Sequence, residues 1–560
     1  MKNATQAMLA KLEAELHLRS SIAPTTTVDC EHGQAACSRC AEVAVEKDIR
    51  ISELEARVSY YEEQFRLLRE KLYGRSSEQG IATAQLGFFD EAESTADLTR
   101  PEPIMEEITY KRSKRSGKRK EDLSALPTEV IDHKLPEEEC FCSECGGALH
   151  EMGHDSRKEL KIVPAQVSVV EHRRAVYSCR NCERNGEGVP IVKAPTPEPV
   201  IKGSLASASA VAHIMAQKYL MHSPLYRQEQ DWKRHGFNLS RQTMANWVIR
   251  CSEDWLEPLY FRMRALLLEE ELLQADETSC LVLNEPGKLA TSQSYMWLYR
   301  TASACINHII IYEYQPSRSH THPKEFLGSW CGYLHTDGYE AYHKLPHGII
   351  VVGCWIHLRR RLVDALKMLP PEQRGDSVPG QAIRRIGYLF HLEELWRELP
   401  HEERHQLRLT ESKPLAEEFF AWLETVRSMP KSALGSAIHY ALTQKKWLMN
   451  VYLDGRTEFS TNRVENSVRP VALGRKNWLF MNSIAGAKAS SVVFSIIETA
   501  KANNLKPFEY LQFLFETLPN ATSSMLDTLL PWGAAVPEHV KMPIPEVSHH
   551  APKSRNGFHD

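Results

Sequence analysis

The sequence lacks any long apolar run, and no stretch approaches the roughly 20 apolar residues that a membrane-spanning helix needs. Residues 1–19 carry acidic side chains and no continuous apolar core, so we expect no secretory signal there. The chain also lacks a strong net charge, because 68 basic residues nearly balance 72 acidic ones and leave a formal charge of −4. These absences argue against a membrane or secreted protein, and they leave any charged partner to be inferred from local patterns.

The composition suits a large globular protein of several domains. Of the 560 residues, 42% are hydrophobic and 25% are charged, as in folded soluble chains. The length predicts roughly three to four domains. Thirteen cysteines without a secretory signal indicate a reducing compartment, where thiols bind metals or stay free. We therefore expect a cytoplasmic location.

The first 128 residues divide into three segments. Residues 1–48 contain Cys30, His32, Cys37 and Cys40, which could hold a zinc ion or remain free thiols. Residues 49–73 carry apolar side chains at alternating steps of three and four, a heptad pattern that predicts a coiled coil and self-association. The alternative is one amphipathic helix packed on its own chain.

A linker rich in charged residues, serine, threonine and proline follows at 74–128. It includes the run 111–120, which has seven basic residues and no acidic one. We interpret this run as an arm that binds the DNA backbone, because cationic segments gain affinity by releasing counterions from DNA. A solvated tail is the alternative.

Residues 129–200 carry two Cys-x-x-Cys pairs, a spacing that lets four sulfurs converge on one tetrahedral Zn²⁺. The four cysteines are Cys142, Cys145, Cys179 and Cys182. Residues 161–170, between the pairs, read as a strand. The segment therefore predicts a zinc ribbon with a structural Zn²⁺, in which the spare Cys140 could replace Cys142.

Residues 201–260 predict a helix-turn-helix module. A helix leads to a turn at Gly236, and Ser240 is a suitable cap for the helix that follows. Arg241, Gln242 and Asn246 on this second helix have side chains that can reach base edges. An ordinary helical hairpin with Trp247 in its core explains the pattern equally well.

Three acidic residues stand where predicted elements begin or end in the second half of the chain. A strand at 271–275 leads to Asp276, a strand at 332–336 leads to Asp337, and Glu465 lies at a helix start. Oxygen ligands from neighbouring elements are what Mg²⁺ or Mn²⁺ prefers, and two such ions promote phosphoryl transfer. The pattern predicts a two-metal site that acts on DNA.

The surrounding elements predict a ribonuclease H-like core with an all-α insertion. Strands are expected at 271–275, 294–301, 307–314, 332–336 and 348–353, with a short helical segment at 323–327. The core comprises 270–361 and 456–505, which includes a long helix near 487–503, and helix-rich residues 362–455 are inserted between them. A C-terminal helix and tail occupy 506–560, and we expect the tail beyond about 535 to be disordered.

Several other residues are candidates for binding phosphate or supporting the site. Arg359, Arg360, Arg475 and Lys476 lie in basic segments close to the predicted acids and could contact DNA. Cys354 and His357 are three positions apart at a predicted helix start, where a structural contact is favoured over a catalytic role.

The ordered set of motifs resembles the insertion sequence 66 family, whose members are bacterial DDE transposases. The similarity runs from about residue 68 to 532. It rests on LYGRSSE at 72–78, CSECGG at 142–147, PLYRQE at 224–229, DET at 276–278, DGY at 337–339, GCWIHLRR at 353–360, ENSVRP at 465–470, GRKNWLF at 474–480 and LLPW at 529–532. The departures are modest: Ser460, Thr461 and Asn466 replace residues that are common in relatives.

This resemblance implies that Asp276, Asp337 and Glu465 form a catalytic triad that binds Mg²⁺. It also implies double-stranded DNA as partner, both as element ends and as target, together with accessory proteins from the same element and a place on the bacterial nucleoid. Two alternatives differ in kind. A DNA-binding regulator would have an inactive nuclease core, and a metal-dependent nuclease would cleave without joining and would not need two DNA-binding modules.

Overall fold

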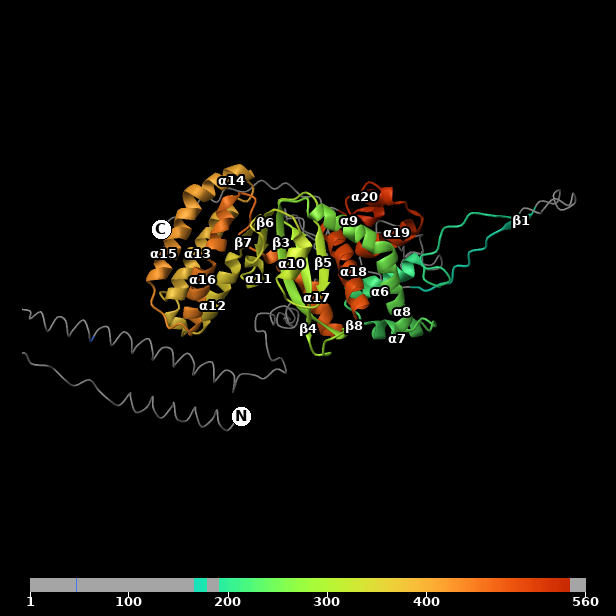
Figure 1. The fold of residues 1–560 in the computed structure, drawn as a ribbon, viewed down its shortest axis with the longest axis horizontal. Coiled ribbons are helices and arrows are strands. Elements are labelled where there is room, and N and C mark those ends of the chain that lie inside the picture. The colour runs from blue at the N-terminus through green and yellow to red at the C-terminus, as the bar shows by residue number, and fades with distance from the viewer. Residues whose placement is uncertain (1–46, 48–165, 179–190, 544–560) are drawn as a thin grey trace, which may run out of the picture.

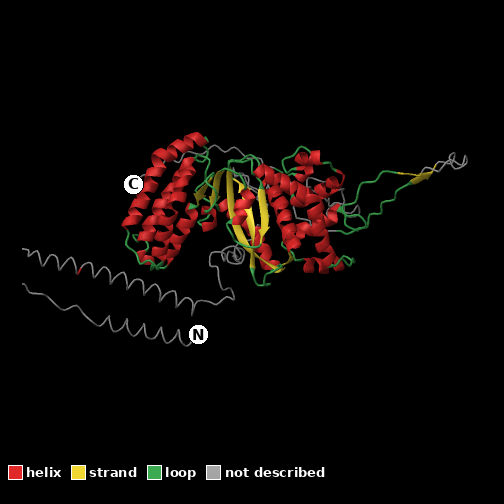
Figure 2. Ribbon diagram, viewed as in Figure 1, coloured by secondary structure: helices red, strands yellow, loops and turns green. Residues whose placement is uncertain are grey.

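The computed structural model describes residues 47, 166–178 and 191–543 (Figure 1). The predicted coiled coil, the basic run, both N-terminal and ribbon cysteine sets and the tail from 544 onward therefore lie outside the described residues. In Figure 2, a mixed sheet lies between a bundle of helices on one side and a second helical body on the other. Mixed α/β architecture, as predicted from the sequence, is confirmed.

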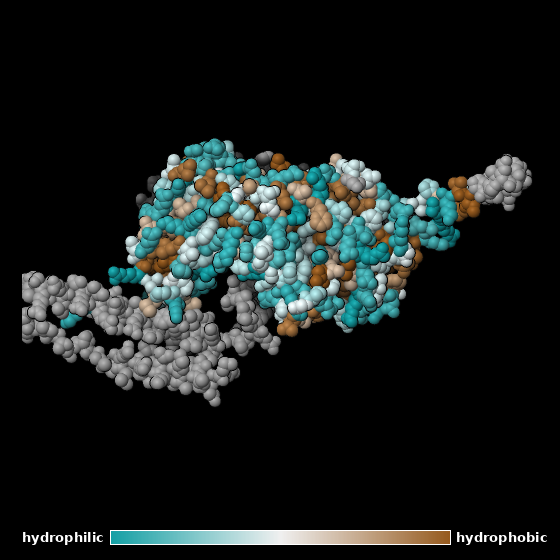
Figure 3. All heavy atoms as spheres, viewed as in Figure 1, coloured by the Kyte–Doolittle hydropathy of each residue, from teal (hydrophilic) through white to brown (hydrophobic). Residues whose placement is uncertain are grey.

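A thin two-stranded arm extends from the body (Figure 1). Its strands β1 (Val176–Ser178) and β2 (Ile191–Lys193) pair antiparallel, with Tyr177 opposite Val192. Apolar side chains on this arm are exposed (Figure 3). The strand expected at 161–170 is wrong for 166–170, which form no strand. Val169 is 94% exposed, and without a neighbouring strand its β-branched side chain does not impose a sheet.

Five helices form the first part of the second helical body. They are α6 (Ala208–Tyr219), α7 (Leu225–Arg234), α8 (Arg241–Cys251), the π-helical turn η3 (Ser252–Leu256) and α9 (Glu257–Leu267). The expected cap is present, because the Ser240 hydroxyl accepts a hydrogen bond from the Thr243 amide at 3.1 Å. Trp247 is buried, so the core of a helical hairpin also exists here.

The central sheet has the order β5-β4-β3-β6-β7, with the short β8 paired to the far end of β3. Strand β4 is antiparallel to both of its neighbours, β3 and β5, whereas β3, β6 and β7 are parallel. The strands are β3 (Leu272–Asn284), β4 (Gln293–Thr301), β5 (Ile310–Gln315), β6 (Gly332–Thr336), β7 (Ile349–Gly353) and β8 (Met481–Ser483). Helix α10 (Thr321–Leu327) and the short α11 (Glu340–His343) connect strands of this sheet.

The C-terminal helices complete the second helical body and cover the sheet. They are α17 (Asn462–Trp478), α18 (Ile484–Ala502), α19 (Pro507–Thr517), η7 (Leu518–Asn520), η8 (Ser523–Met525), α20 (Leu526–Leu529) and η9 (Glu538–Val540). Helix α18 is buried along most of its length, beside β5 and between α6, α8 and α19. A helix buried on all sides is apolar or carries small hydroxyl residues that are satisfied within the protein.

Side chains cover both edges of the sheet. On edge strand β5, the amides of Ile310 and Tyr312 donate to Thr499 Oγ1 and Ser495 Oγ of α18 at 3.0 and 2.8 Å. On edge strand β7, the Val351 carbonyl accepts a hydrogen bond from Asn450 Nδ2 at 2.8 Å. Backbone groups at these edges are therefore satisfied within the chain.

The insertion is a helical bundle with its own core, and no strand occurs in it between residues 354 and 453. Its members are α12 (Trp355–Lys367), η4 (Pro371–Gln373), α13 (Val378–Leu395), α14 (His401–Leu407), η5 (Arg408–Ser412), α15 (Lys413–Thr425), α16 (Ala433–Met449) and η6 (Asn450–Leu453). Trp355, Phe419 and Phe420 lie at the centre of this core, which is separate from the core around α18.

The prediction that the chain is disordered beyond about 535 is wrong for residues 535–543. Val536 and Val540 are buried, and the Lys506 amide donates to the Val540 carbonyl at 2.7 Å. Burial of these two apolar side chains stabilises an ordered segment, although the proline-rich composition suggested disorder. Among the residues that the structure describes, no helix combines the length and apolar character needed to cross a membrane.

Candidate active site

The strand register places Asp276 and Asp337 side by side. Strands β3 and β6 are parallel, and Gln274 pairs with His335 as the last matched position. Both acids lie two residues further along, at the same register position. Because side chains alternate along a strand, each acid shares a face with the paired residue before it. Adjacent strands are about 4.8 Å apart, so two carboxylates meet at this end of the sheet.

Strands β3 and β6 separate just before Asp276. At Asp276, strand β3 is still paired with Leu298 of β4, but its pairing with β6 has ended at Gln274. The Asp276 carboxylate accepts a hydrogen bond from the Glu277 amide at 2.8 Å, and Asp337 accepts one from the Tyr339 amide at 2.9 Å. Asp276 thereby bonds to the next residue of its own strand, whereas Asp337 bonds to the turn that follows β6.

Glu465 reaches the site from the first turn of α17, which packs against β3. Its amide donates to the Thr461 carbonyl at 3.0 Å, the first bond of the helix. One carboxylate oxygen, Oε2, accepts from Arg360 Nη2 at 3.1 Å, whereas Oε1 lies 3.5 Å from His357 Nε2. Both oxygens of Glu465 are therefore directed at residues of α12.

Burial and mutual repulsion disfavour the ionised form of Asp276 in this acidic cluster. Burial raises the pKa of Asp276 well above its ordinary value, and the negative charges of Glu277, Asp337 and Glu465 raise it further. A divalent cation would relieve this repulsion. Asp276, Asp337 and Glu465 offer oxygen donors, the type that Mg²⁺ or Mn²⁺ prefers, but they are not among the groups of described residues whose ligand atoms all lie within 4.8 Å of one another.

Glu277 belongs to the site but was missed by the sequence analysis. Its side chain is only 1% exposed, and its carboxylate accepts hydrogen bonds from Arg318 Nε at 2.7 Å and from the Tyr342 hydroxyl at 2.5 Å. The Arg318 guanidinium also stacks over the Tyr339 ring at 3.7 Å. No local signal pointed to this role, because the neighbours of Glu277 are Asp276 and Thr278 and its partners Arg318 and Tyr342 lie 41 and 65 positions away. Glu277 thus ties β3 to the turn that carries Asp337.

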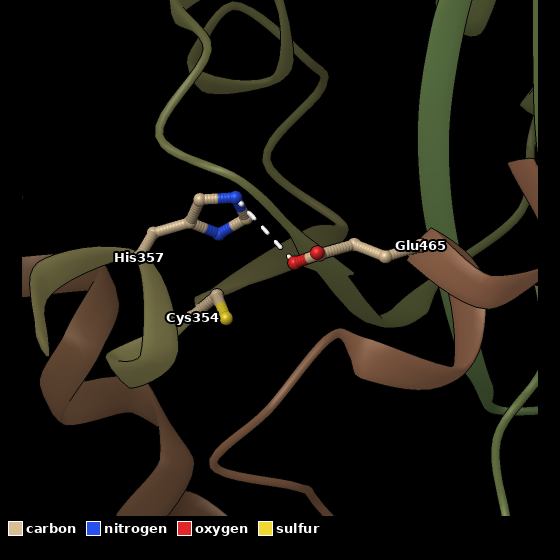
Figure 4. A group of neighbouring side chains, drawn as sticks. All are labelled: Cys354, His357 and Glu465. Carbon is tan, nitrogen blue, oxygen red and sulfur yellow. Dashed lines mark ion pairs between the residues drawn. The ribbon is translucent and has the colours of Figure 1, made fainter. Parts of the chain in front are cut away.

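Cys354 and His357 lie against Glu465 (Figure 4). Cys354 precedes α12 and is buried, and its sulfur accepts a hydrogen bond from the Thr461 amide at 3.4 Å. Burial opposes a charge on His357, but the adjacent Cys354 sulfur and the carboxylates of Glu465 and Asp337 raise its pKa to about 9. Burial likewise disfavours the Cys354 thiolate, yet hydrogen bonding to His357 lowers the pKa of that thiol. The structure therefore brings this pair to the acidic site.

The basic residues selected from the sequence have different surroundings. Arg359 is exposed on α12, while Arg360 pairs with Glu465 as described. The Arg475 guanidinium donates to the Ser279 hydroxyl at 2.6 Å and to its carbonyl, which fixes α17 to β3. Lys476 is exposed next to it.

The residues selected on α8 are at the surface. Arg241, Gln242 and Asn246 are exposed at its N-terminal half, on the side away from buried Trp247. The Arg241 amide donates to Glu229 of α7 at 3.1 Å, which links the two helices at the turn. The geometry therefore leaves these three side chains available to an external partner.

Four family models match the chain. The model described as "Transposase IS66 family" matches residues 203–489, and the "IS66 C-terminal element" matches 495–532. The "zinc-finger binding domain of transposase IS66" matches 139–183, a range that includes the four ribbon cysteines. "Transposase C of IS166 homeodomain" matches 60–131, a range that the sequence analysis divided between the coiled coil and the basic linker. A zinc-finger domain and a helix-turn-helix-like domain are thus part of the chain.

Curated relatives from Sinorhizobium fredii (strain NBRC 101917 / NGR234) cover most of the chain. The uncharacterized protein y4jD is 32% identical over 410 residues, which are 70% of this chain and 78% of the relative. The uncharacterized protein y4qI is 28% identical over 517 residues, 88% of this chain and 92% of the relative. The main family model alone spans half of the sequence and contains all three acids. The chain belongs to the IS66 transposase family.

Proposed function

We propose that this protein is a metal-dependent DDE transposase that cleaves the ends of a mobile element and joins them to target DNA. The observation that supports the proposal is that Asp276 and Asp337 each lie two residues beyond the last paired position of β3 and β6, where the charges of Asp337 and Glu465 act on Asp276. The family membership supports a transposase, and the three acids supply the site that its chemistry needs.

The sheet supports a ribonuclease H-like core. Three antiparallel strands followed by two parallel ones, with the first acid on the central strand β3 and the second after β6, are the arrangement that we expect of this fold. The third acid is delivered by α17 after a helical insertion of the chain. The inserted helices account for the 128 positions between Asp337 and Glu465 in the sequence, and α17 would bring Glu465 back to the sheet.

Asp276, Asp337 and Glu465 would hold Mg²⁺ ions. When bound, such ions lower the pKa of a water or of a 3′-hydroxyl and stabilise the leaving oxygen of a phosphodiester. Other protein residues would position the acids. The Glu277–Arg318 pair would fix the turn that carries Asp337, and Arg360 would orient Glu465. Exposed Arg359 is placed to bind a DNA phosphate beside these acids.

The remaining modules would recognise the DNA. The zinc-finger domain, with a structural Zn²⁺ on the four ribbon cysteines, and the exposed face of α8 are candidates for binding element ends, with Arg241, Gln242 and Asn246 at the base edges. Self-association through residues 49–73 would pair two ends, and accessory proteins from the same element would assist. The protein would act in the bacterial cytoplasm, at the nucleoid.

A strand-transfer assay tests the proposal. Purified protein is mixed with labelled element-end DNA, a plasmid target and Mg²⁺. Asp337→Asn should lower joining by several orders of magnitude while end binding is retained, because only the metal site is altered. The matched control is Glu340→Gln, which removes an exposed carboxylate paired with Lys344 and should leave joining unchanged.

The other outcomes identify the alternatives. Cleavage without joining would favour a nuclease, and binding with neither step would favour a DNA-binding regulator. An Asp337→Asn protein that joins DNA as fast as the unaltered protein would contradict the proposed triad.

A further inference from the structure

One group of side chains near the site has a donor set that Mg²⁺ does not use. The Cys354 sulfur, a His357 ring nitrogen and a Glu465 oxygen all lie within 4.8 Å of one another. They come from the start of α12 and the first turn of α17 (Figure 4). Thiolate and imidazole ligands suit borderline and soft ions such as Zn²⁺, whereas Mg²⁺ requires oxygen.

The distances fit a tetrahedral ion after small shifts. With metal–ligand bonds of about 2.0–2.3 Å, the ligand atoms of a tetrahedral site are roughly 3.3–3.8 Å apart. The 3.5 Å separation of His357 Nε2 and Glu465 Oε1 already lies in this range. Glu465 would bind through Oε1 alone, so Oε2 could keep its hydrogen bond from Arg360.

The surroundings of the three residues also match a metal site. His357 directs Nε2 at the Glu465 carboxylate, which is the orientation that a shared ion would require (Figure 4). The Cys354 sulfur receives the Thr461 amide, and such outer hydrogen bonds support a metal-bound thiolate.

We propose that Cys354, His357 and Glu465 form a second metal site, for Zn²⁺ or a similar thiophilic divalent ion, that shares Glu465 with the acidic triad. An ion there would hold Glu465 against α12 and withdraw it from Asp276 and Asp337. Zinc would then inhibit the Mg²⁺-dependent reaction. This inhibition rests on the proposed function, whereas zinc binding itself does not.

The site can be tested by titrating Co²⁺ into the full chain, purified with zinc already bound to its zinc-finger domain. Cobalt in the Cys354 site should produce a thiolate-to-cobalt charge-transfer band that saturates at one equivalent, and excess Zn²⁺ but not Mg²⁺ should remove it. Cys354→Ser should abolish the band. The matched control is Cys331→Ser, which alters an exposed thiol outside the cluster and should leave the band intact.

Two further variants keep the test decisive if Cys354→Ser fails to fold. Loss of an outer-shell partner already costs metal sites tenfold or more, so His357→Gln and Glu465→Gln should each weaken cobalt binding by at least about tenfold. The proposal is overturned if the unaltered protein gives no band, or if these variants bind cobalt as tightly as it does.

Inhibition is measured separately, as Mg²⁺-dependent cleavage of element-end DNA at rising Zn²⁺. The midpoint of inhibition should match the zinc affinity from the cobalt competition, and a mismatch would overturn the shared use of Glu465. A cobalt band from a protein that never cleaves DNA would contradict the proposed function and retain the metal site. DNA cleavage by a protein that gives no cobalt band would support the proposed function and contradict the metal site.

Discussion

Glu277 and Arg408 are charged side chains that are buried together with ion-pair partners. At Asp276, burial and the charges of Glu277 and Asp337 instead raise the pKa. Glu313 on β5 differs, because its Oε2 is buried without a hydrogen-bond partner. Burial raises the pKa of Glu313 to about 7, although Gln315 and Arg264 oppose the rise.

Because of this raised pKa, the free energy of unfolding should fall as the pH rises. In the unfolded chain Glu313 ionises near its ordinary pKa of 4.5, whereas the folded protein holds the proton up to about pH 7. The stability that protonation provides is present below 4.5 and is lost as the pH rises to 7, a change of about 3 kcal/mol. Glu313→Gln should therefore raise the melting temperature at pH 8 and change it little at pH 4.5.

The matched control for that prediction is Glu325→Gln, which alters an exposed carboxylate close to Glu313. Melting temperatures of both variants between pH 4.5 and 8 provide the measurement. An equal gain for Glu313→Gln at both ends of the range would show that ionisation is not the cause.

Elements far apart in the sequence are joined by single anchors, and Arg408 is the clearest of them. It lies in η5, is 1% exposed, and donates to Glu393 of α13 at 2.7 and 2.5 Å. It also donates to the carbonyls of Asp454 and Thr457, both at 2.9 Å. Those carbonyls belong to the segment that leads from the insertion to α17, so Arg408 fixes the path by which Glu465 returns to the sheet.

Removing this anchor should destabilise the insertion strongly. Arg408→Met leaves Glu393 buried without its partner and should cost about 3–5 kcal/mol in the free energy of unfolding. The double variant Arg408→Met/Glu393→Met should lose less than the two single variants together, because neither charge is then left alone. Denaturant unfolding of all four proteins measures this coupling. Strictly additive losses would contradict it.

The elements that the sequence could predict are those with local signals. The strand that leads to Asp337 and the Ser240 cap lie where they were expected. The strand expected at 271–275 is wrong in its end, because β3 continues to Asn284 and Asp276 lies within it. The predictions of a strand at 166–170 and of a disordered tail at 535–543 were wrong, because strand pairing and burial depend on residues that are distant in the sequence. Glu277 and the approach of Cys354 to Glu465 were not predictable either, since no local pattern reports which side chains meet across elements.

At the scale of the molecule, residues 191–543 contain two hydrophobic cores, one around α18 and the sheet and one inside the helical insertion. Cores that share few side chains can unfold separately. We expect two transitions in calorimetric unfolding. Phe420→Ala, which removes about 3–5 kcal/mol of packing from the insertion, should shift one transition only. The matched variant Phe494→Ala in α18 should shift the other, and a single transition that moves in both variants would contradict the prediction.

The covered sheet edges have a consequence for how copies of this chain can assemble. A free edge strand invites a strand from a second molecule, which is a common route to both specific dimers and aggregates. Here Ser495 and Thr499 occupy the hydrogen-bonding positions of β5, and Asn450 occupies one on β7. A strand from a second protomer would have to displace these side chains in order to pair there. Self-association of this chain is therefore expected to use surfaces other than the edges of β5 and β7.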